Sequence, residues 1–176
     1  MTFERLESET VWEGRIAVVR RERWREEDGE EVEREVVAHP GAVAVVAHDG
    51  ERLYMVTQPR EAVGEQSLLE LPAGKLEDGE DVLETAKREL AEEIGKAAAS
   101  WKRLTSFYTS PGFADEEVHV YLATDLSDAE GESGEEERIE IVEVPLAELD
   151  DAIAHCHDAK SLVGLLSARA FEGLGG

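Results

Sequence analysis

The chain has 176 residues, of which 42 are acidic and 18 are basic, so its formal net charge is -24. A chain of this length can form one domain of ordinary size with a real core, burying roughly two-thirds of the surface that it exposes when unfolded. The charge argues against nucleic acid as a partner, because binding to a phosphate backbone needs an excess of Lys and Arg residues, and here acidic residues outnumber basic ones by more than two to one.

The cysteine content and the first residues predict the compartment. Cys156 is the only cysteine, so no disulfide can form within the chain and a reducing environment is expected. The opening segment MTFERLESET is charged and lacks the apolar region of a signal peptide. No apolar run approaches the ~20 residues that cross a membrane. We therefore expect a cytoplasmic protein without a membrane partner.

An antiparallel arm is expected at the N-terminus. Residues 14–38 alternate loosely between polar and apolar side chains, and Asp28-Gly29 in the middle has the composition of a hairpin turn. We assign residues 1–40 to this β arm, as part of the same folding unit as residues 41–176.

A second pair of strands follows directly. The run from Ala42 to Ala47 contains only apolar residues, so it predicts a strand that is buried on both faces. Asp49-Gly50 supplies a turn before a strand from Leu53 to Gln58, and a short run from Leu68 to Leu71 leads into a loop.

The clearest helix of the chain begins near Asp81. Apolar residues recur at helical spacing up to Ile94, and Gly95 has the composition of a C-terminal stop. The apolar positions are Val82, Leu83, Ala86, Leu90 and Ile94.

The rest of the chain mixes strands and helices. Strands are expected at 101–108, 118–123 and 139–144, with the acidic loop SDAEGESGEEE before the last of them. Pro145 suits the first turn of a helix, and residues 160–171 predict a closing amphipathic helix. This order indicates an α/β sandwich with a mixed sheet.

The predicted helix places like charges together. Residues 74–95 hold eight carboxylates and three cations, and Glu89, Glu92 and Glu93 share one arc about 100° wide. Neighbouring like charges and the negative end of the helix dipole both oppose this arrangement. Two interpretations follow: a solvated acidic surface, or a site for a divalent cation such as Mg²⁺, which prefers oxygen ligands.

The residues around these glutamates form a known pattern. They fit G-x5-E-x7-R-E-U-x-E-E-x-G-U, where U is a bulky aliphatic residue, and so the chain resembles the Nudix hydrolase family. The matching residues are Gly74, Glu80, Arg88, Glu89, Leu90, Glu92, Glu93 and Gly95. Lys96 departs from the pattern, because the family usually has an apolar residue there. The resemblance implies an α/β/α sandwich with a mixed β-sheet.

The flanking segments resemble the ADP-ribose pyrophosphatase branch of that family. They are LLELPAGKLEDGED, SPGFADE and DAKSLVGLL, and Pro111 follows Lys96 by the fifteen residues typical of the branch. In this branch the N-terminal strands are usually exchanged in a homodimer, so the resemblance implies a homodimer that shares substrate contacts.

The resemblance also implies a metal site. Glu89, Glu93 and the carbonyl of Ala73 would bind Mg²⁺, with Mn²⁺ as the alternative ion. Glu92 would assist or bind a second ion, and Arg88 would orient the glutamates through charge-assisted hydrogen bonds.

The general base is expected in the acidic loop before the last strand. Alignment on Pro145 gives Glu135 as the base and Glu137 as a metal-contacting residue, and Glu136 is the base if the loop is shifted by one residue. The alternative is that this glutamate run is only a solvated loop.

Five residues are expected near the substrate. Arg60 matches a family arginine close to the phosphates or the ribose, and Glu70 matches a substrate-side carboxylate. Gly74 would let the backbone approach the metal, and Pro111 lies in the matching flank. Trp24 would stack on adenine across a dimer interface, unless it only packs there; Arg60 could instead be a surface arginine at a strand end.

These features predict an enzyme that hydrolyses ADP-ribose to AMP and ribose 5-phosphate with Mg²⁺. A neighbouring alternative is a diphosphatase for another nucleoside diphosphate sugar or a dinucleotide. An alternative of a different class is a Nudix module that senses ADP-ribose without hydrolysing it, although such modules commonly lose the box glutamates that this chain keeps.

Overall fold

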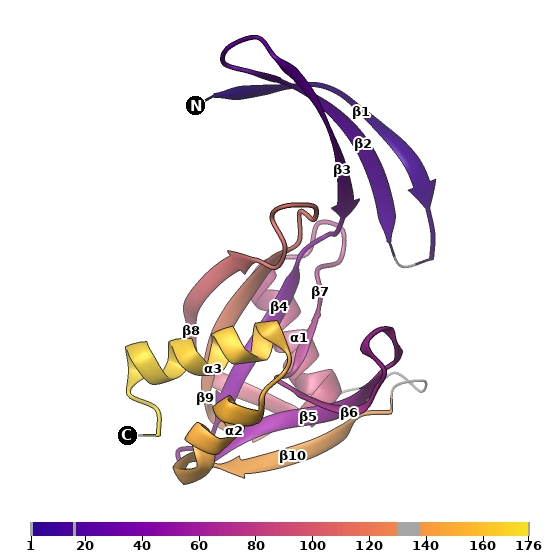
Figure 1. Ribbon diagram of the computed structural model, residues 1–176. Helices are drawn as coiled ribbons and strands as arrows, with labels where there is room; N and C mark the ends of the chain where they lie inside the picture. Colours follow the sequence, from indigo (N-terminus) through magenta and orange to yellow (C-terminus); the bar gives the residue numbers. More distant parts are fainter. Residues whose placement is uncertain (1, 16, 130–137, 176) are drawn as a thin grey trace. The chain divides into compact units, whose positions relative to one another are not determined.

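The computed structural model describes residues 2–15, 17–129 and 138–175 of the chain, which divides into two compact units (Figure 1). We call Met1–Gly41 with Tyr108–Glu117 the arm unit, and Ala42–Phe107 with Val118–Gly176 the sheet unit. Each unit is described separately.

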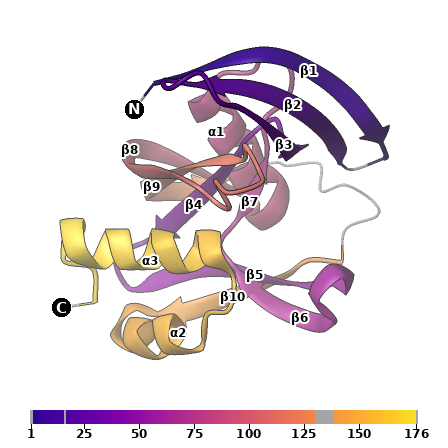
Figure 2. The same ribbon diagram turned by 45° about the horizontal axis from the view of Figure 1, so that its top comes forward.

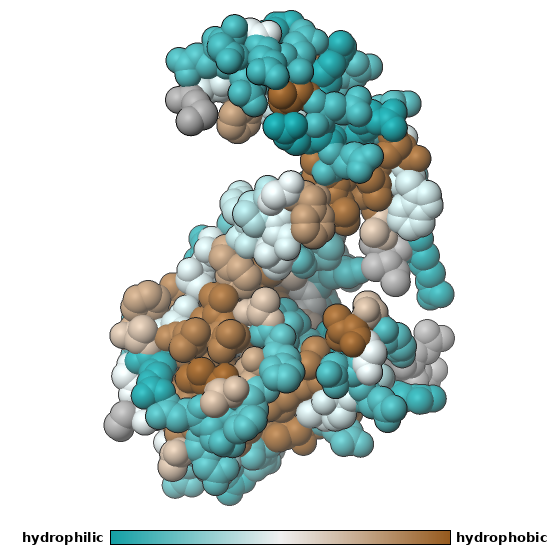
Figure 3. Space-filling model, viewed as in Figure 1, coloured by the Kyte–Doolittle hydropathy of each residue, from teal (hydrophilic) through white to brown (hydrophobic). Residues whose placement is uncertain are grey.

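The arm unit is built on three antiparallel strands in the order β1-β2-β3. They are β1 (Phe3–Glu13), β2 (Val18–Glu26) and β3 (Glu31–Ala38). The predicted turn joins β2 to β3, where Gly29 has a φ of 89° and the Asp28 carboxylate accepts the Glu30 N–H. The strand β1 was not predicted, and almost all of its residues are exposed. Figure 3 shows mainly hydrophilic residues over these strands.

The segment between residues 108 and 117 belongs to the arm unit through its backbone contacts with β3. The Val37 N–H donates to the carbonyl oxygen of Phe113 at 2.7 Å, and the His39 N–H donates to the Asp115 carboxylate at 2.7 Å. Val37 and Ala114 also form a parallel bridge. A loop distant in sequence therefore completes this unit.

The sheet unit contains a seven-stranded mixed sheet. Five strands follow the order β10-β5-β4-β9-β8, while β6 pairs with β5 and β7 pairs with β4. The strand β4 pairs in parallel with β9 and antiparallel with β5 and β7. The bounds are β4 (Ala42–His48), β5 (Arg52–Arg60), β6 (Glu65–Glu70), β7 (Ala73–Lys75), β8 (Lys96–Tyr108), β9 (Glu117–Asp128) and β10 (Glu140–Pro145).

Helices cover both faces of this sheet, and Figure 2 shows α1 and α3 on opposite sides of β4. The α-helices are α1 (Val82–Ile94), α2 (Leu149–His155) and α3 (Ala159–Glu172), and the 3-10 turns are η1 (Glu61–Val63) and η2 (Leu146–Glu148). Pro145 ends β10 directly before η2, so the predicted helix start is a 3-10 turn that leads into α2. In the described residues, no helix has the length and apolar composition needed to cross a membrane.

The core consists of two layers that β4 separates. Val45 packs in one layer with Leu90 of α1, and Val46 packs in the other with Leu165 of α3. Residues 42–47 of β4 are at most 7% exposed, because alternate side chains point into alternate layers. This confirms the strand buried on both faces and the predicted α/β/α sandwich. Figure 3 shows that hydrophobic residues also gather on the outer surface over α3.

Lys96, the departure from the Nudix pattern, is the first residue of β8. Its Nζ donates to the Asp128 carboxylate at 2.6 Å and lies 5.6 Å from the centroid of the Tyr54 ring. The lysine therefore packs on an aromatic face and keeps its charge paired, so the chain leaves α1 without an apolar residue at this position.

Candidate active site

The helix α1 begins and ends at the residues that its sequence predicts. The Asp81 carboxylate accepts the N–H groups of Leu83 and Glu84 at 2.9 Å and 3.3 Å, which caps the first turn. Gly95 adopts a left-handed conformation with a φ of 64°, and its N–H donates to carbonyls of the last turn. These two caps set the ends of α1, and the packing of Leu90 and Ile94 into the core fixes the direction of its acidic face.

Glu89 lies against the backbone of Gly74. The strand β7, which carries Gly74, pairs with β4 beside α1, and a Cβ atom at Gly74 would lie 1.9 Å from Oε1 of Glu89. Only glycine leaves room for the carboxylate here. Glu89 is 9% exposed, so a solvated acidic surface does not describe this residue.

Arg88 joins three carboxylates of the box. Its guanidinium donates to both oxygens of Glu80 at 3.1 Å, to Glu89 at 2.7 Å and to Glu92 at 3.0 Å. These bonds, with Glu80 first, raise the pKa of Arg88 above its ordinary value. The same pairing lowers the pKa of Glu80 from 4.5 to about 2. Arg88 thus makes the carboxylates of Glu89 and Glu92 converge on one guanidinium nitrogen.

Glu93 reaches back to the loop that precedes the box. Its Oε2 accepts the Ala73 N–H at 2.9 Å, and the neighbouring carbonyl of Pro72 accepts the Val45 N–H at 2.9 Å. Ala73 is thereby held between α1 and β4. Glu89 and Glu93 of α1 therefore contact neighbouring residues of β7, and the role of each residue in metal binding stays a prediction.

The oxygen donors between α1 and β7 fit a hard divalent ion. Carboxylates and a backbone carbonyl are the ligands that Mg²⁺ takes, and Gly74 provides the space for one of them. Within the part of the chain that the structure describes, no three His, Cys, Asp or Glu side chains are already gathered at metal-binding spacing.

Arg60 and Glu70 form an ion pair at the ends of adjacent strands. Arg60 donates to the two oxygens of Glu70 at 2.6 Å and 2.8 Å, and Glu70 is 1% exposed. Burial alone would raise the pKa of Glu70, but hydrogen bonds from Arg60 and Lys160 outweigh it and lower that pKa.

The charge of one box glutamate acts on Arg60. Glu70 is the main cause of its raised pKa, and the charge of Glu93 adds to the effect. The two groups are therefore within electrostatic range of each other. Lys160, the second cation on Glu70, was not predicted from the sequence. The only feature that pointed to it was its position in the first turn of the closing helix, after Asp158.

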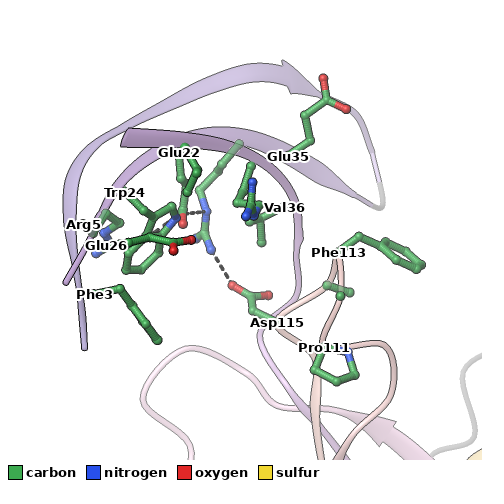
Figure 4. Close-up of a pocket in the computed structure, with 15 residues that line it drawn as sticks. Phe3, Arg5, Glu22, Trp24, Glu26, Glu35, Val36, Pro111, Phe113 and Asp115 are labelled. Carbon is green, nitrogen blue, oxygen red and sulfur yellow. Dashed lines mark hydrogen bonds and ion pairs between the residues drawn. The ribbon is translucent and has the colours of Figure 1, made fainter. Parts of the chain in front are cut away.

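Trp24 and Pro111 line one cavity within the arm unit (Figure 4). The cavity has a volume of about 590 Å³. Phe3 packs edge-on to the Trp24 ring at a centroid distance of 5.3 Å, and Arg5 lies 5.8 Å above the ring. The sequence had placed both Trp24 and Pro111 near a substrate, and the structure brings them together from β2 and the 108–117 segment.

The cavity also has charged walls that the sequence did not predict. The Arg20 guanidinium pairs with the Asp115 carboxylate and lies 3.2 Å from Glu22, which is 2% exposed (Figure 4). Glu22 also pairs with Arg5 at 3.3 Å. Arg20 and Glu22 lie on β2, whereas Arg5 lies on β1 and Asp115 on a distant loop, so no sequence motif joins them.

The predicted general base cannot be placed. Glu135, Glu136 and Glu137 all lie outside the described residues. Their assignment remains a prediction.

Comparison with known proteins places the chain in a family. Residues 38–163 match the NUDIX domain, so the chain belongs to the Nudix family. It is a Nudix hydrolase, similar to the ADP-ribose pyrophosphatase of Bacillus subtilis (strain 168), with 44% identity over 84% of this chain and 82% of that protein. It is also similar to the methanol dehydrogenase activator of Bacillus methanolicus, with 39% identity over 96% of this chain and 94% of that protein.

A solved structure shares the fold over nearly the whole chain. The crystal structure of an ADP compounds hydrolase aligns with a TM-score of 0.86 and 25% identity, covering 98% of this chain and 95% of that chain. The fold and the family predicted from the box are therefore confirmed.

Proposed function

We propose that this protein hydrolyses ADP-ribose to AMP and ribose 5-phosphate. The observation that carries the proposal is the nearly buried Glu89 carboxylate, fitted against Gly74 and joined through Arg88 to Glu92. The similarity to an ADP-ribose pyrophosphatase and to an ADP compounds hydrolase supports the choice of substrate.

Mg²⁺ is the proposed ion, with Mn²⁺ as the alternative. The Ala73 carbonyl, Glu89 and Glu93 would hold it, with Glu92 assisting and Glu137 as a further contact. When bound, such an ion offsets the charge of the diphosphate and of the developing leaving group. Arg88 orients Glu89 and Glu92 through the hydrogen bonds that it donates to both carboxylates.

Arg60, Trp24 and Pro111 are the proposed contacts to the substrate. Arg60, with a side chain that is 41% exposed, can still donate to a phosphate or ribose oxygen while it pairs with Glu70. Trp24 would stack on the adenine, and Pro111 would line the same pocket. Arg5 beside the Trp24 ring adds positive charge there.

The chemical step is the attack of water on one phosphorus of the diphosphate. A bond forms between the water oxygen and phosphorus, the bridging P–O bond breaks, and the leaving phosphate keeps the bridging oxygen. Glu135, or Glu136 if the loop is shifted, would accept the proton of the water. If the Glu135→Gln and Glu136→Gln variants both keep near-normal turnover, this assignment is rejected.

A homodimer formed through the arm is part of the proposal. Large apolar side chains are exposed on β1, with Phe3 at 73% and Trp12 at 55%. A second copy of the chain packed on β1 would bury these side chains. Light scattering should give twice the chain mass, and a monomer at all concentrations would contradict the proposed homodimer.

The cytoplasm remains the expected compartment, on the basis of the single cysteine.

The activity can be tested with a panel of nucleoside diphosphate derivatives. Purified protein is incubated with ADP-ribose, other nucleoside diphosphate sugars and dinucleotides, in Mg²⁺, Mn²⁺ or EDTA, and products are identified by ³¹P NMR. We expect AMP and ribose 5-phosphate only when a divalent ion is present. Much faster cleavage of another compound would favour the neighbouring diphosphatase, and tight binding of ADP-ribose without AMP would favour the sensing module.

A further inference from the structure

The first turn of α3 is bonded to the strand end that leads into the box. The Ser161 Oγ accepts the Leu71 N–H at 2.7 Å and donates to the Asp158 carboxylate at 2.5 Å. Asp158 also caps α3 by accepting the Ser161 N–H at 2.9 Å. Ser161 is 0% exposed, so these bonds are shielded from water. The cap of a distant helix therefore fixes the backbone next to Glu70.

Lys160 occupies the same turn and contacts Glu70 directly. Its Nζ lies 2.5 Å from Oε2 of Glu70 and 3.0 Å from Oδ1 of Asp158. Arg60 binds both oxygens of the same Glu70 carboxylate. One buried carboxylate is thus shared by two cations from different elements. The charges of these two cations and of the two carboxylates, Glu70 and Asp158, sum to zero.

Gly164 allows α3 to lie this close to the sheet. A Cβ atom at Gly164 would lie 2.6 Å from Cδ1 of Leu71 and 3.4 Å from side chains of Val46 and Val120. Gly164 follows Lys160 by four residues, so the two share one side of α3. The close approach of the helix therefore sets the reach of Lys160 to Glu70.

We infer that Lys160 is a positioning residue, which holds the Glu70 carboxylate and through it the Arg60 guanidinium in the orientation that the diphosphate meets. The inference rests on the proposed function. Lys160 is 18% exposed at its side chain and is directed at Glu70, whereas Arg60 is 41% exposed and can meet a ligand. Removal of Lys160 changes the summed charge of the cluster to -1, so Glu70 competes with the substrate for Arg60.

The inference predicts a change in KM rather than in kcat. Lys160→Met should raise KM for ADP-ribose roughly tenfold, the effect of losing about one charge-assisted hydrogen bond, with kcat nearly unchanged. Lys160→Arg should restore most of the affinity because it retains the cation. Lys102→Met is the matched control, since Lys102 is 60% exposed and pairs with Glu172. A KM equal to wild type in folded Lys160→Met would overturn the inference.

A double-mutant cycle separates positioning from direct contact with the substrate. In a Glu70→Gln background, Lys160→Met should change KM by less than about twofold, because Lys160 then has no carboxylate to hold. A further tenfold rise in that background would show that Lys160 contacts the substrate itself.

A ligand-free measurement keeps the inference testable if the proposed function fails. NMR of ¹⁵N-arginine-labelled protein reports the Nε–H of Arg60, which donates to Glu70 in the structure. Its signal should move and exchange faster in Lys160→Met, and return in Lys160→Arg. An unchanged Arg60 signal would overturn the positioning role, whereas absence of ADP-ribose hydrolysis by the wild type would overturn only the proposed function.

Discussion

Glu70 and Glu89 are both nearly buried glutamates of the sheet unit, but their surroundings differ. Glu70 is 1% exposed and shares its charge with Arg60 and Lys160. Glu89 is 9% exposed and is bonded to Arg88, which also serves Glu80 and Glu92. The Glu70 carboxylate is compensated by the chain's own cations, while the Glu89 carboxylate belongs to an acidic cluster that suits an added cation. Substitution of Glu by Gln should therefore lower mainly the turnover at Glu89 and mainly the stability of the fold at Glu70.

The largest effect is expected at Glu89. Glu89→Gln should lower turnover of ADP-ribose roughly a thousandfold, because a proposed metal ligand is lost from the site where we expect phosphate charge to develop. The free energy of unfolding should change by less than about 1 kcal/mol, since removing one of several neighbouring like charges relieves repulsion. Steady-state kinetics and urea unfolding measure both quantities.

The control for Glu89 lies on the exposed side of the same helix. The Glu84 side chain is 61% exposed and pairs with Lys87 at 2.7 Å. Glu84→Gln should keep turnover within about twofold of wild type, as for a surface substitution away from the site. Equal losses in both variants would mean that helix charge, and not the Glu89 site, governs activity.

Gly74→Ala should have the next largest effect. The added Cβ would lie 1.9 Å from the Glu89 carboxylate, which must then move. A displacement of this size at a catalytic group lowers turnover about a hundredfold. The thermal unfolding midpoint should stay close to that of wild type, because the side chain of Glu89 and not the core yields. Normal turnover by the folded variant would refute the tight fit between the two residues.

Glu70→Gln should affect stability more clearly than Glu89→Gln does. It leaves Lys160 and Arg60 without their shared carboxylate, which we expect to cost about 2 kcal/mol, below the value for a fully buried pair because Arg60 is 41% exposed. Urea unfolding of the two Gln variants under the same conditions makes the comparison. An equal or greater loss of stability in Glu89→Gln would contradict the assignment of Glu70, and not Glu89, as the carboxylate that the chain's own cations compensate.

The smallest effect concerns acid stability at Glu80. Its pKa is lowered from 4.5 to about 2, so its pairing with Arg88 contributes fully above pH 4.5 and is lost as the pH falls toward 2. The difference in unfolding midpoint between wild type and Glu80→Gln should therefore be constant at neutral pH and shrink below pH 4.5. A difference that stays constant down to pH 2.5 would show that this ion pair does not stabilise the fold.

Local patterns were sufficient to predict the elements that carry the box. The caps at Asp81 and Gly95 and the apolar run from Ala42 to Ala47 depend on neighbours in sequence, and the structure confirms them. The strand β1 was missed because its residues are exposed on both faces, so its side chains do not alternate between buried and exposed. The strand β7 has three residues and exists only through its pairing with β4.

The contacts missed at the site are those between distant segments. Lys160 meets Glu70 across 90 residues, and Arg20 meets Asp115 across 95. Such pairs depend on how closely elements pack, as Gly164 shows for α3, and this packing cannot be read from the charge pattern of one segment. The family pattern supplied Arg60 and Glu70 but not the cation that joins them to α3.

The most direct test of the central claim is metal binding at Glu89. Mn²⁺ binding is measured by electron paramagnetic resonance, with a non-hydrolysable ADP-ribose analogue present, in wild type, Glu89→Gln and Glu84→Gln. We expect binding by wild type and Glu84→Gln, and at least a tenfold weaker affinity in Glu89→Gln because a charged ligand is lost. Equal affinity in all three proteins, or no binding by wild type, would contradict this expectation.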